Sequence, residues 1–441
     1  MSGAARFDVA VIGGGPAGIA ASISAAEAGA RTLLVEREER IGGNASNAFV
    51  HTICGLYFEL PADHATDTEA PRTARYAHPG FPRRFAEGLL HASGAAPPER
   101  AGRVYVLPIS PPLFGSHAEQ LCAQAGSLTV LTRAELTHLA LDAGGAELHL
   151  ATTTANRRFE ASVVLDTTGD ATAAALGGAE TVQAAPEDLQ LPSYIVQLTN
   201  VEDEHLAGFS RLHLTRAVSR AAQKGELDPR AESVLIRPGV AVGDAYLTLN
   251  IPRPGGAGYR PLDADLLREL QESARARAEA VVAYLRANRP GFAACRLAAL
   301  PRRIGVRETR RLVGISHLTS SDILSGRRRT DQVAVSTWPI ELWEDHRGAR
   351  FEHPDGPTSI PLSSLVSRTH PRLGAAGRCL SATHGALGAL RVIGTAFATG
   401  EAIGVAAAVA ADRGIPLSDV PARTVRAHIT ARAAGNPSLA D

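Results

Sequence analysis

The sequence predicts an α/β protein in which a parallel sheet and its helices are interrupted by an inserted α+β lobe. Three observations lead to this prediction. An apolar run near the start of the chain passes through a glycine-rich turn into an alanine-rich helix and a second apolar run. Later apolar segments, at residues 162–166 and 377–382, are expected to be strands, and a long amphipathic helix lies between them. These landmarks divide the chain into residues 1–180, 181–355 and 356–441, with the middle part as the inserted lobe.

The composition of the chain excludes several classes of protein. Its 441 residues are 45% hydrophobic and 20% charged, which is ordinary for a folded chain of more than one domain. The 45 Lys and Arg residues balance the 45 Asp and Glu residues, so we expect neither nucleic acid nor a membrane surface as a partner. Four cysteines without CxxC spacing argue against a disulfide framework and a metal site. The apolar run at 403–411 is too short to span a bilayer, and we expect a cytoplasmic protein.

The chain up to Glu36 has the order strand, glycine turn, helix, strand and acid. Residues 7–12 suit a strand that is buried on both faces. Gly13 permits the tight turn, Gly15 lets the backbone approach a pyrophosphate, and Gly18 lets the helix pack closely on the strand. The start of the helix offers free N–H groups to the phosphates, and Glu36 can accept hydrogen bonds from ribose hydroxyls. The complete unit predicts a Rossmann-like dinucleotide site.

The segment after Glu36 indicates which dinucleotide binds. Gly42 and Gly43 form a pair that resembles the loop of flavoproteins along the pyrophosphate and ribityl chain of FAD. A domain for NAD would continue directly into a second strand–helix–strand crossover, which this sequence does not do. No second GxGxxG unit occurs in the sequence, so tight NAD(P)H binding is not expected. We therefore predict FAD as the cofactor.

Two further regions fit this arrangement. Residues 162–166 form a predicted buried strand that ends in a polar glycine turn at 168–170, and the apolar runs 128–131, 136–141 and 147–152 are expected to form the β-meander before it. The meander and the strand after it would return the chain to the first sheet.

In the middle part of the chain, residues 262–288 carry an apolar stripe at helical spacing. Asp263 is placed to cap the first turn of this helix. The stripe predicts a core helix of the inserted lobe.

Three motifs together resemble a bacterial family of FAD-dependent oxidoreductases in the glutathione-reductase/fumarate-reductase superfamily. They are GGGPAG at 13–18, GVRETRR at 305–311, and GRCLSATH at 377–384 with its continuation to 404. The resemblance covers most of the chain and implies a glutathione-reductase-type FAD-binding domain with an inserted substrate lobe. It also implies a dehydrogenase or oxidase. Segments such as 339–343 and 358–363 depart from the family pattern, so no substrate is carried over from relatives.

The residues expected to bind FAD come from all of these segments. They are Gly13, Gly15, Pro16, Ala17, Gly18, Glu36, Arg37, Gly42, Gly43, Asn44, Ala134, Thr168, Gly169, Asp170, Gly394, Thr395 and Ala396.

His384 and Arg391 are candidates for catalysis in the C-terminal motif. Arg391 precedes a helix expected to start near Thr395, and a cation and a helix N-terminus there would stabilise negative charge on the reduced flavin. The alternative for Arg391 is an ion pair between lobes. His384 can take a proton while a hydride leaves the substrate, or it can bond the flavin or the backbone.

Arg307 is the third candidate, in a dense charge group with Glu308, Arg310 and Arg311. On a strand, Arg307 and Arg311 would share one face. The group can clamp a carboxylate of the substrate, or it can form a buried ion-pair network between the lobes.

His51 and Cys54 follow the Gly42–Gly43 loop and are expected beside the flavin. Either could hold FAD covalently, or both could form a packed wall.

The leading functional prediction is transfer of a hydride between a small molecule and flavin. Two alternatives stay open: a flavin monooxygenase, and a flavin-stabilised RNA- or protein-binding module. The sequence identifies neither the substrate nor the electron acceptor, and an oligomer is compatible with it.

Overall fold

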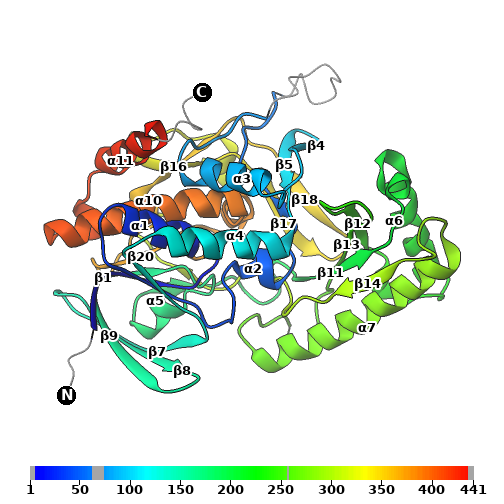
Figure 1. Ribbon diagram of the computed structural model, residues 1–441, viewed down its shortest axis with the longest axis horizontal. Coiled ribbons are helices and arrows are strands. Elements are labelled where there is room, and N and C mark those ends of the chain that lie inside the picture. The colour runs from blue at the N-terminus through cyan, green and yellow to red at the C-terminus, as the bar shows by residue number, and fades with distance from the viewer. Residues whose placement is uncertain (1–4, 62–73, 256–257, 436–441) are drawn as a thin grey trace.

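The computed structural model describes residues 5–61, 74–255 and 258–435. Within these residues, two main sheets each have their own apolar core and covering helices (Figure 1). The fold is mixed α/β with a parallel-strand sheet, as the sequence predicts.

The larger sheet is seven-stranded and contains the first described strand. Its strand order is β6-β2-β1-β9-β8-β7, and β20 pairs with β9 off this path. All pairings among β6, β2, β1, β9 and β20 are parallel. Val9 to Ile12 are buried on both faces of this sheet, which explains the unbroken apolar run. The bounds are β1 (Ala5–Ile12), β2 (Thr32–Val35), β6 (Leu128–Leu131), β9 (Asn156–Asp166) and β20 (Leu373–Ala375).

The meander consists of β7 (Ala134–Leu141), β8 (Ala146–Thr152) and β9, joined in antiparallel pairs. The prediction that residues 128–131 begin it is wrong, because β6 pairs in parallel with β2 instead. The chain reaches β6 through helix α4 (Pro111–Gln124), and such a crossover is what parallel pairing requires. A short apolar run cannot reveal which neighbour it will pair with.

Helices α1 (Pro16–Glu27) and α10 (Ile393–Arg413) lie side by side on one face of the large sheet (Figure 1). By length and composition α10 could cross a membrane, but its apolar stretch is wholly buried inside the protein. The apolar run at 403–411 is therefore part of a longer core helix.

The second sheet is antiparallel and has the order β12-β13-β11-β14. Helix α7 (Ala264–Asn288) lies along it, as Figure 1 shows. The predicted helix at 262–288 and its cap are confirmed, because Asp263 Oδ1 accepts a hydrogen bond from the Leu266 N–H at 3.1 Å. The strands are β11 (Ser193–Thr199), β12 (Leu235–Pro238), β13 (Ala245–Asn250) and β14 (Arg296–Ala299).

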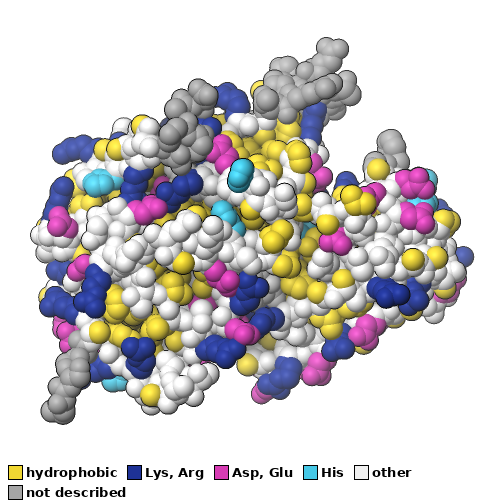
Figure 2. Space-filling view, in the orientation of Figure 1, with side chains coloured by type: hydrophobic (Ala, Val, Ile, Leu, Met, Phe, Trp, Pro, Cys, Tyr) yellow, Lys and Arg dark blue, Asp and Glu magenta, His cyan; other side chains and the backbone are white. Residues whose placement is uncertain are grey.

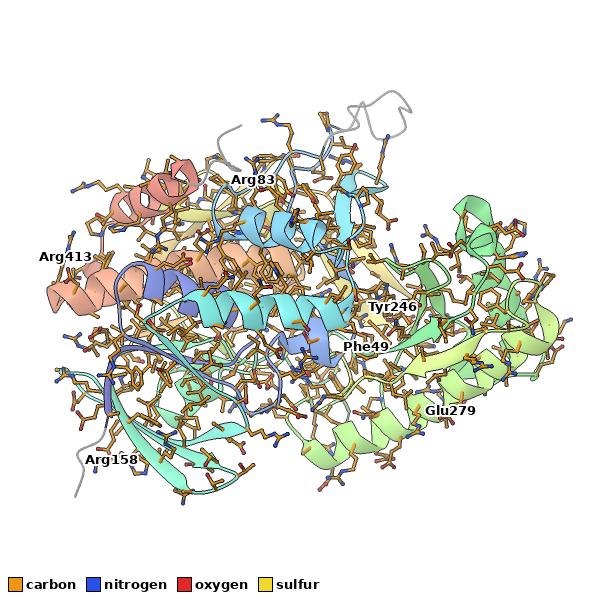
Figure 3. All side chains as sticks on the ribbon, viewed as in Figure 1. Phe49, Arg83, Arg158, Tyr246, Glu279 and Arg413 are labelled. Atoms are coloured by element: carbon orange, nitrogen blue, oxygen red, sulfur yellow. The ribbon has the colours of Figure 1, made fainter. Side chains whose placement is uncertain are left out.

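Phe49 and Tyr246 mark where the two halves of the molecule meet (Figure 3). Phe49 belongs to the segment after the glycine turn and Tyr246 to β13, and both are buried in one small apolar cluster with Ile195. The second sheet is thus packed directly against the segment that leaves the dinucleotide unit.

The remaining elements are short or lie at the periphery. They are α2 (Gly43–Asn47), β3 (Thr52–Ile53), α3 (Phe81–His91), β4 (Glu99–Ala101), β5 (Val104–Pro108), α5 (Thr172–Leu176), β10 (Thr181–Val182), α6 (Gly208–Gln223), β15 (Arg311–Leu312), α8 (Ser320–Leu324), β16 (Gln332–Ser336), β17 (Ile340–Asp345), β18 (Gly348–Glu352), β19 (Thr358–Pro361), α9 (His384–Leu390) and α11 (Ala422–Ala434).

Acidic and basic side chains are interspersed over the face of the molecule drawn in Figure 2. This distribution agrees with the equal numbers of basic and acidic residues in the chain.

Candidate active site

A cavity of about 610 Å³ is lined by residues of both main sheets and of the hairpin β17–β18. The glycine turn and the end of β2 form one wall, and β11 and β13 contribute Ser193, Ile195, Thr248 and Asn250 to another. The start of α10 also reaches the cavity. This one space therefore joins the predicted dinucleotide site to the middle part of the chain.

The glycine turn leaves the start of α1 open to the cavity. Gly13 has a φ of +104°, and a Cβ at Gly18 would lie 1.8 Å from the Gly13 carbonyl oxygen, so both positions need glycine. A Cβ at Gly15 would meet only Gly43 Cα, at 3.8 Å, so on the protein side the space beside Gly15 is open. Helix α1 has no side-chain cap and no acidic residue in its first turn. Its N-terminus therefore fits a pyrophosphate.

Glu36 lies at the cavity end of β2 with its carboxylate fixed by the backbone. Oε2 accepts from the Gly14 N–H at 2.7 Å, and Oε1 accepts from the Glu38 N–H at 2.9 Å. The residue is only 7% exposed and lines the cavity. A carboxylate oxygen can accept more than one hydrogen bond, so Glu36 can also accept from ribose hydroxyls.

The start of α10 is a second uncapped helix N-terminus on the same cavity. It has no side-chain cap and no acid in its first turn, and Val392, Ile393 and Ala396 line the cavity. A Cβ at Gly394 would lie 2.5 Å from backbone atoms of Gly55, so this glycine allows the helix to approach the 50–55 loop. The positive end of α10 is therefore available to developing negative charge.

Arg391 lines the cavity next to Glu341. The Arg391 Nε–H donates to Gln190 Oε1 at 3.2 Å, and Nη2 lies 3.9 Å from Glu341 Oε1. Two indole N–H groups also donate to this carboxylate, from Trp338 at 2.8 Å and from Trp343 at 2.6 Å. Glu341 is therefore held by two indole N–H groups and pairs with Arg391.

Arg307 also lines the cavity, but it does not share a face with Arg311. It donates to the Leu191 carbonyl and, from Nη2, to Asn250 Oδ1 at 2.9 Å, and its guanidinium lies 4.3 Å from the Trp343 ring centroid. Burial and the nearby charge of Arg391 lower the pKa of Arg307 to about 9. The shared face that a strand would give these two arginines does not form, since only Arg311 and Leu312 are in strand β15.

Glu308, Arg311 and His384 form a separate buried network. Arg311 Nη1 donates to Glu308 Oε1 at 2.5 Å, and His384 Nδ1 lies 2.8 Å from Glu308 Oε2. Burial acts to raise the pKa of Glu308, but the hydrogen bond from His384 and the charges of His384 and Arg311 hold it below its usual value. The same hydrogen bond, against the cost of burial, raises the pKa of His384. His384 is not among the described residues that line the cavity.

His51 and Cys54 both line the cavity. The His51 ring stacks on Tyr246 with centroids 4.5 Å apart, and its Nδ1 lies 3.2 Å from the Phe49 carbonyl oxygen. Burial, and then the charge of Arg237, lowers the pKa of His51 to about 3. Burial, and then the charge of Glu341, raises the pKa of Cys54 to about 12. Both groups are neutral near pH 7, as suits a packed wall.

Most of the residues expected to bind FAD line the cavity. These are Gly13, Gly15, Pro16, Ala17, Glu36, Arg37, Gly43, Asn44, Ala134, Thr168, Gly169 and Ala396. The cavity lining among the described residues does not include Gly18, Gly42, Asp170, Gly394 or Thr395. Asp170 lies behind Arg378, which lines the cavity and donates to Asp170 Oδ1 at 2.9 Å.

Several cavity residues were missed by the sequence analysis. Glu341, Trp338 and Trp343 lie in or beside the 339–343 segment, which the sequence marked only as a departure from the family pattern. Asn250 ends a strand that carried no motif. The arginines that Glu341 and Asn250 contact, Arg391 and Arg307, lie 50 and 57 residues away in the sequence, so no local signal reveals these contacts.

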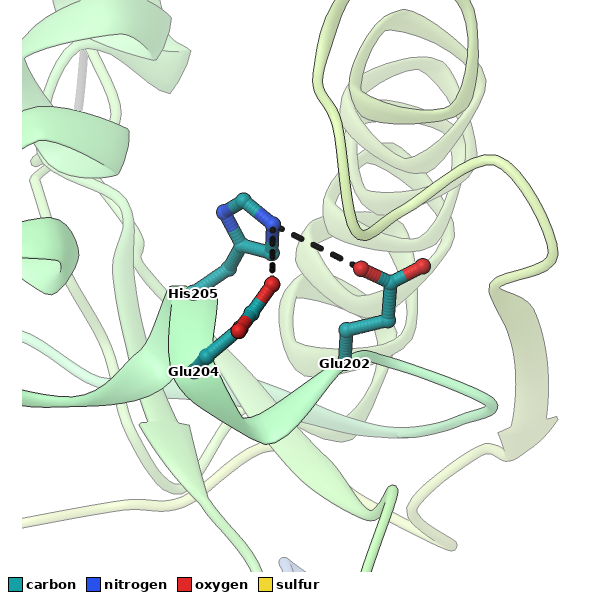
Figure 4. Close-up of side chains that lie close together, drawn as sticks. All are labelled: Glu202, Glu204 and His205. Carbon is teal, nitrogen blue, oxygen red and sulfur yellow. Dashed lines mark ion pairs between the residues drawn. The ribbon is translucent and has the colours of Figure 1, made fainter.

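One group of acidic and histidine side chains lies away from the cavity. His205 Nε2 is 3.5 Å from Glu202 Oε2 and 3.6 Å from Glu204 Oε1, and Figure 4 shows the three side chains converging. Both glutamates are exposed to solvent. Such a group at the surface forms ion pairs without any metal, and nothing else among the described residues around it indicates a ligand.

Comparison with known proteins identifies the family of the whole chain. The family model described as "FAD dependent oxidoreductase" matches residues 8–429. Over 42 residues the chain is 51% identical to a soluble pyridine nucleotide transhydrogenase of Chromohalobacter salexigens, covering 10% of this chain and 9% of that protein.

Solved structures are similar at low identity. A geranylgeranyl bacteriochlorophyll reductase-like protein from Thermoplasma acidophilum has 15% identity and a TM-score of 0.46, covering 97% of this chain and 83% of that one. The p-nitrophenol 4-monooxygenase PnpA from Pseudomonas putida has 13% identity and a TM-score of 0.45, covering 98% of this chain and 91% of that one.

Proposed function

The chain belongs to the FAD-dependent oxidoreductase family, and from this premise we propose that it transfers a hydride between a small-molecule substrate and its FAD cofactor. The observation that carries the proposal is that two uncapped helix N-termini, those of α1 and α10, reach one cavity. The first suits the pyrophosphate, and the second suits the end of the cofactor where negative charge develops on reduction.

The residues at the α1 end would hold the cofactor. The backbone around Gly15 and the start of α1 would bind the phosphates, and Glu36 would bind a ribose. FAD, once bound there, supplies the group that accepts or donates the hydride. We include in the same proposal that the FAD-binding domain is of the glutathione-reductase type.

The residues at the other end would act on the substrate. Arg391 and the start of α10 would stabilise negative charge, while Trp338 and Val392 would exclude water. For His384 the contacts favour a positioning role, because Glu308 joins it to Arg311 and the histidine lies outside the cavity lining. Residues 181–355 would then be the substrate lobe, since β11 and β13 line the cavity.

Anaerobic addition of small molecules to the purified holoprotein tests the proposal. We expect FAD to be released on denaturation, and a substrate to bleach the flavin absorbance without NAD(P)H. Bleaching that requires NADPH, followed by incorporation of an oxygen atom from O₂ into the substrate, would replace the proposal with a flavin monooxygenase. Absence of bound flavin after reconstitution would refute both.

A further inference from the structure

Arg307 is a cation in the cavity wall without a carboxylate partner. Its two hydrogen bonds go to neutral acceptors, the Leu191 carbonyl and Asn250 Oδ1, and its face lies on the Trp343 ring. No ion pair to Arg307 occurs within residues 5–61, 74–255 and 258–435. A guanidinium has more N–H donors than these two contacts use, and a buried cation without an anion is costly.

The nearest carboxylate, that of Glu341, makes no ion pair with Arg307, although its charge acts to raise the pKa of the arginine. Glu341 accepts from both indole N–H groups and pairs with Arg391. Arg237, another cation of the cavity wall, has Glu99 at 3.4 Å. Arg303 also lines the cavity without an ion pair among the described residues, but the charged groups around it are Arg37, Glu36, Arg378 and Glu38 at the dinucleotide end. Arg307 is therefore the cation beside Trp343 whose charge has no ion-pair partner in the described chain.

Asn250 adds an unused donor at the same place. It is 2% exposed and lines the cavity. Because the guanidinium can only donate, the amide oxygen Oδ1 must face Arg307, which fixes Nδ2 on the other side of the amide. This Nδ2 is buried and has no partner in the described part of the chain. A buried donor without an acceptor is destabilising, and an oxygen of a ligand would satisfy it.

Part of the cavity wall is apolar. Val104, Val106, Trp338 and Val392 form a small cluster with Cys54 and Ala101, and all six line the cavity. This cluster is connected to Arg307 by a chain of contacts. Trp338 and Trp343 both donate to Glu341, and the Trp343 ring lies against the Arg307 guanidinium. Within the described residues, a ligand here meets one cation without an ion-pair partner, one free amide donor and an apolar surface.

From this arrangement, and resting on the proposed function, we infer that the substrate is a carboxylic acid with an apolar body. Its carboxylate binds Arg307 and Asn250 Nδ2, and its body packs against the Val104–Trp338–Val392 cluster. The phosphates of FAD are the other anion that could reach Arg307. The glycine turn and the start of α1 already provide for them, and Arg307 lies beside Asn250 at the end of β13.

Asn250→Asp tests the inference with little change in volume. The new carboxylate still accepts a hydrogen bond from Arg307, and it neutralises the charge of that arginine. It also replaces the free Nδ2 donor with an oxygen that repels an anion. Holoprotein would be titrated calorimetrically with benzoate and with its uncharged analogue benzamide. We expect wild-type protein to bind benzoate about tenfold or more tightly than benzamide, and Asn250→Asp to remove that preference. FAD content should stay unchanged.

Two further variants complete the design. Asn288→Asp, which adds the same charge at the exposed end of α7, should bind benzoate as wild type does. Arg307→Gln should lose the preference for benzoate as Asn250→Asp does. Any of three results would overturn the inference. Wild type could bind benzoate and benzamide equally, or it could show no saturable benzoate binding at millimolar concentration. The third result is a preference for benzoate that survives Asn250→Asp. Loss of FAD from Arg307→Gln together with intact benzoate binding would assign the arginine to the cofactor phosphates instead.

The two proposals fail in different ways. If purified protein holds no flavin, the proposed function fails, and benzoate-dependent thermal stabilisation of the apoprotein still decides whether the acid site exists. If flavin is bound but benzoate and benzamide bind alike, only the inference about the acid fails.

Discussion

Gly400 in α10 lies so close to α1 that a Cβ there would stand 2.2 Å from the carbonyl oxygen of Ala17. Four residues later, a Cβ at Gly404 would stand 2.3 Å from the Ala21 carbonyl oxygen. These two contacts set the separation of the helices. Because both helices begin at the cavity, they also set the distance between the two positive helix ends.

Replacing Gly400 with alanine should therefore disturb both stability and cofactor binding. We expect the free energy of unfolding to fall by about 1–3 kcal/mol, the range for overpacking a core, and FAD affinity to fall with it. Denaturant unfolding and titration of apoprotein with FAD measure the two effects. Gly126→Ala is the matched control, because a Cβ there has no neighbour within 4 Å. Equal behaviour of the two variants would show that the helices can move apart without cost.

Glu36→Ala should weaken FAD binding by about 1–3 kcal/mol, since it removes charge-assisted hydrogen bonds to the ribose. Glu38→Ala, two residues further along and outside the cavity lining, should leave the affinity unchanged. Fluorescence titration of the apoproteins compares them. An unchanged FAD affinity in Glu36→Ala would show that the Glu36 carboxylate serves only its backbone partners, the Gly14 and Glu38 N–H groups.

Arg391→Ala should slow reduction of the flavin by substrate much more than it weakens FAD retention. Negative charge develops on the flavin only as the hydride arrives, so a cation acts on the transition state and on the reduced product. We expect a loss of about 2–4 kcal/mol in the reductive step and a lower flavin midpoint potential. Stopped-flow reduction and redox titration measure these.

The pair with Glu341 provides the control for this variant, because Arg391→Ala leaves that carboxylate without its cation. The double variant Arg391→Ala/Glu341→Gln should recover part of the potential. A wild-type potential and rate in the single variant would mean that Arg391 only joins the two parts of the chain.

The contact between His384 and Glu308 should make stability depend on pH. The pKa of His384 is raised above its ordinary 6.5, so its contribution is complete below pH 6.5 and is lost as the pH rises through the folded-state value. His384→Gln should be less stable than wild type by about 1.5–3 kcal/mol at low pH, and the difference should shrink as the pH rises. Denaturant unfolding across the pH range tests this, with exposed His91→Gln as the control.

The same variant separates a catalytic from a positioning role. If His384 is the proton acceptor, His384→Gln abolishes the pH dependence of flavin reduction. If it positions Glu308 and Arg311, the rate falls but its pH dependence is retained.

The dinucleotide unit could be predicted because its signal is local. Gly13, Gly15, Gly18 and Glu36 stand within one strand–helix–strand segment, where each has a steric or hydrogen-bonding task. The strand β6 was misplaced because pairing partners in a sheet are not encoded in a run of four apolar residues.

The opposite end of the cavity could not be predicted in the same way. Arg391 is a candidate from the sequence, but its charged neighbour Glu341 lies 50 residues away, and nothing local to either residue indicates that the two meet. Arg307 and Arg311 diverge because the segment between them is irregular, and regular alternation along a strand does not apply there.

The close contact between Ala17 and Gly400 also constrains how the protein is made. Helix α1 is synthesised before α10, and residues 28–392 separate the two helices. Until α10 has been made, the α1 face that carries Ala17 and Ala21 has no helix to cover it. A nascent chain that stops before α10 should therefore expose this face and recruit chaperones, and release of the complete chain should end that exposure.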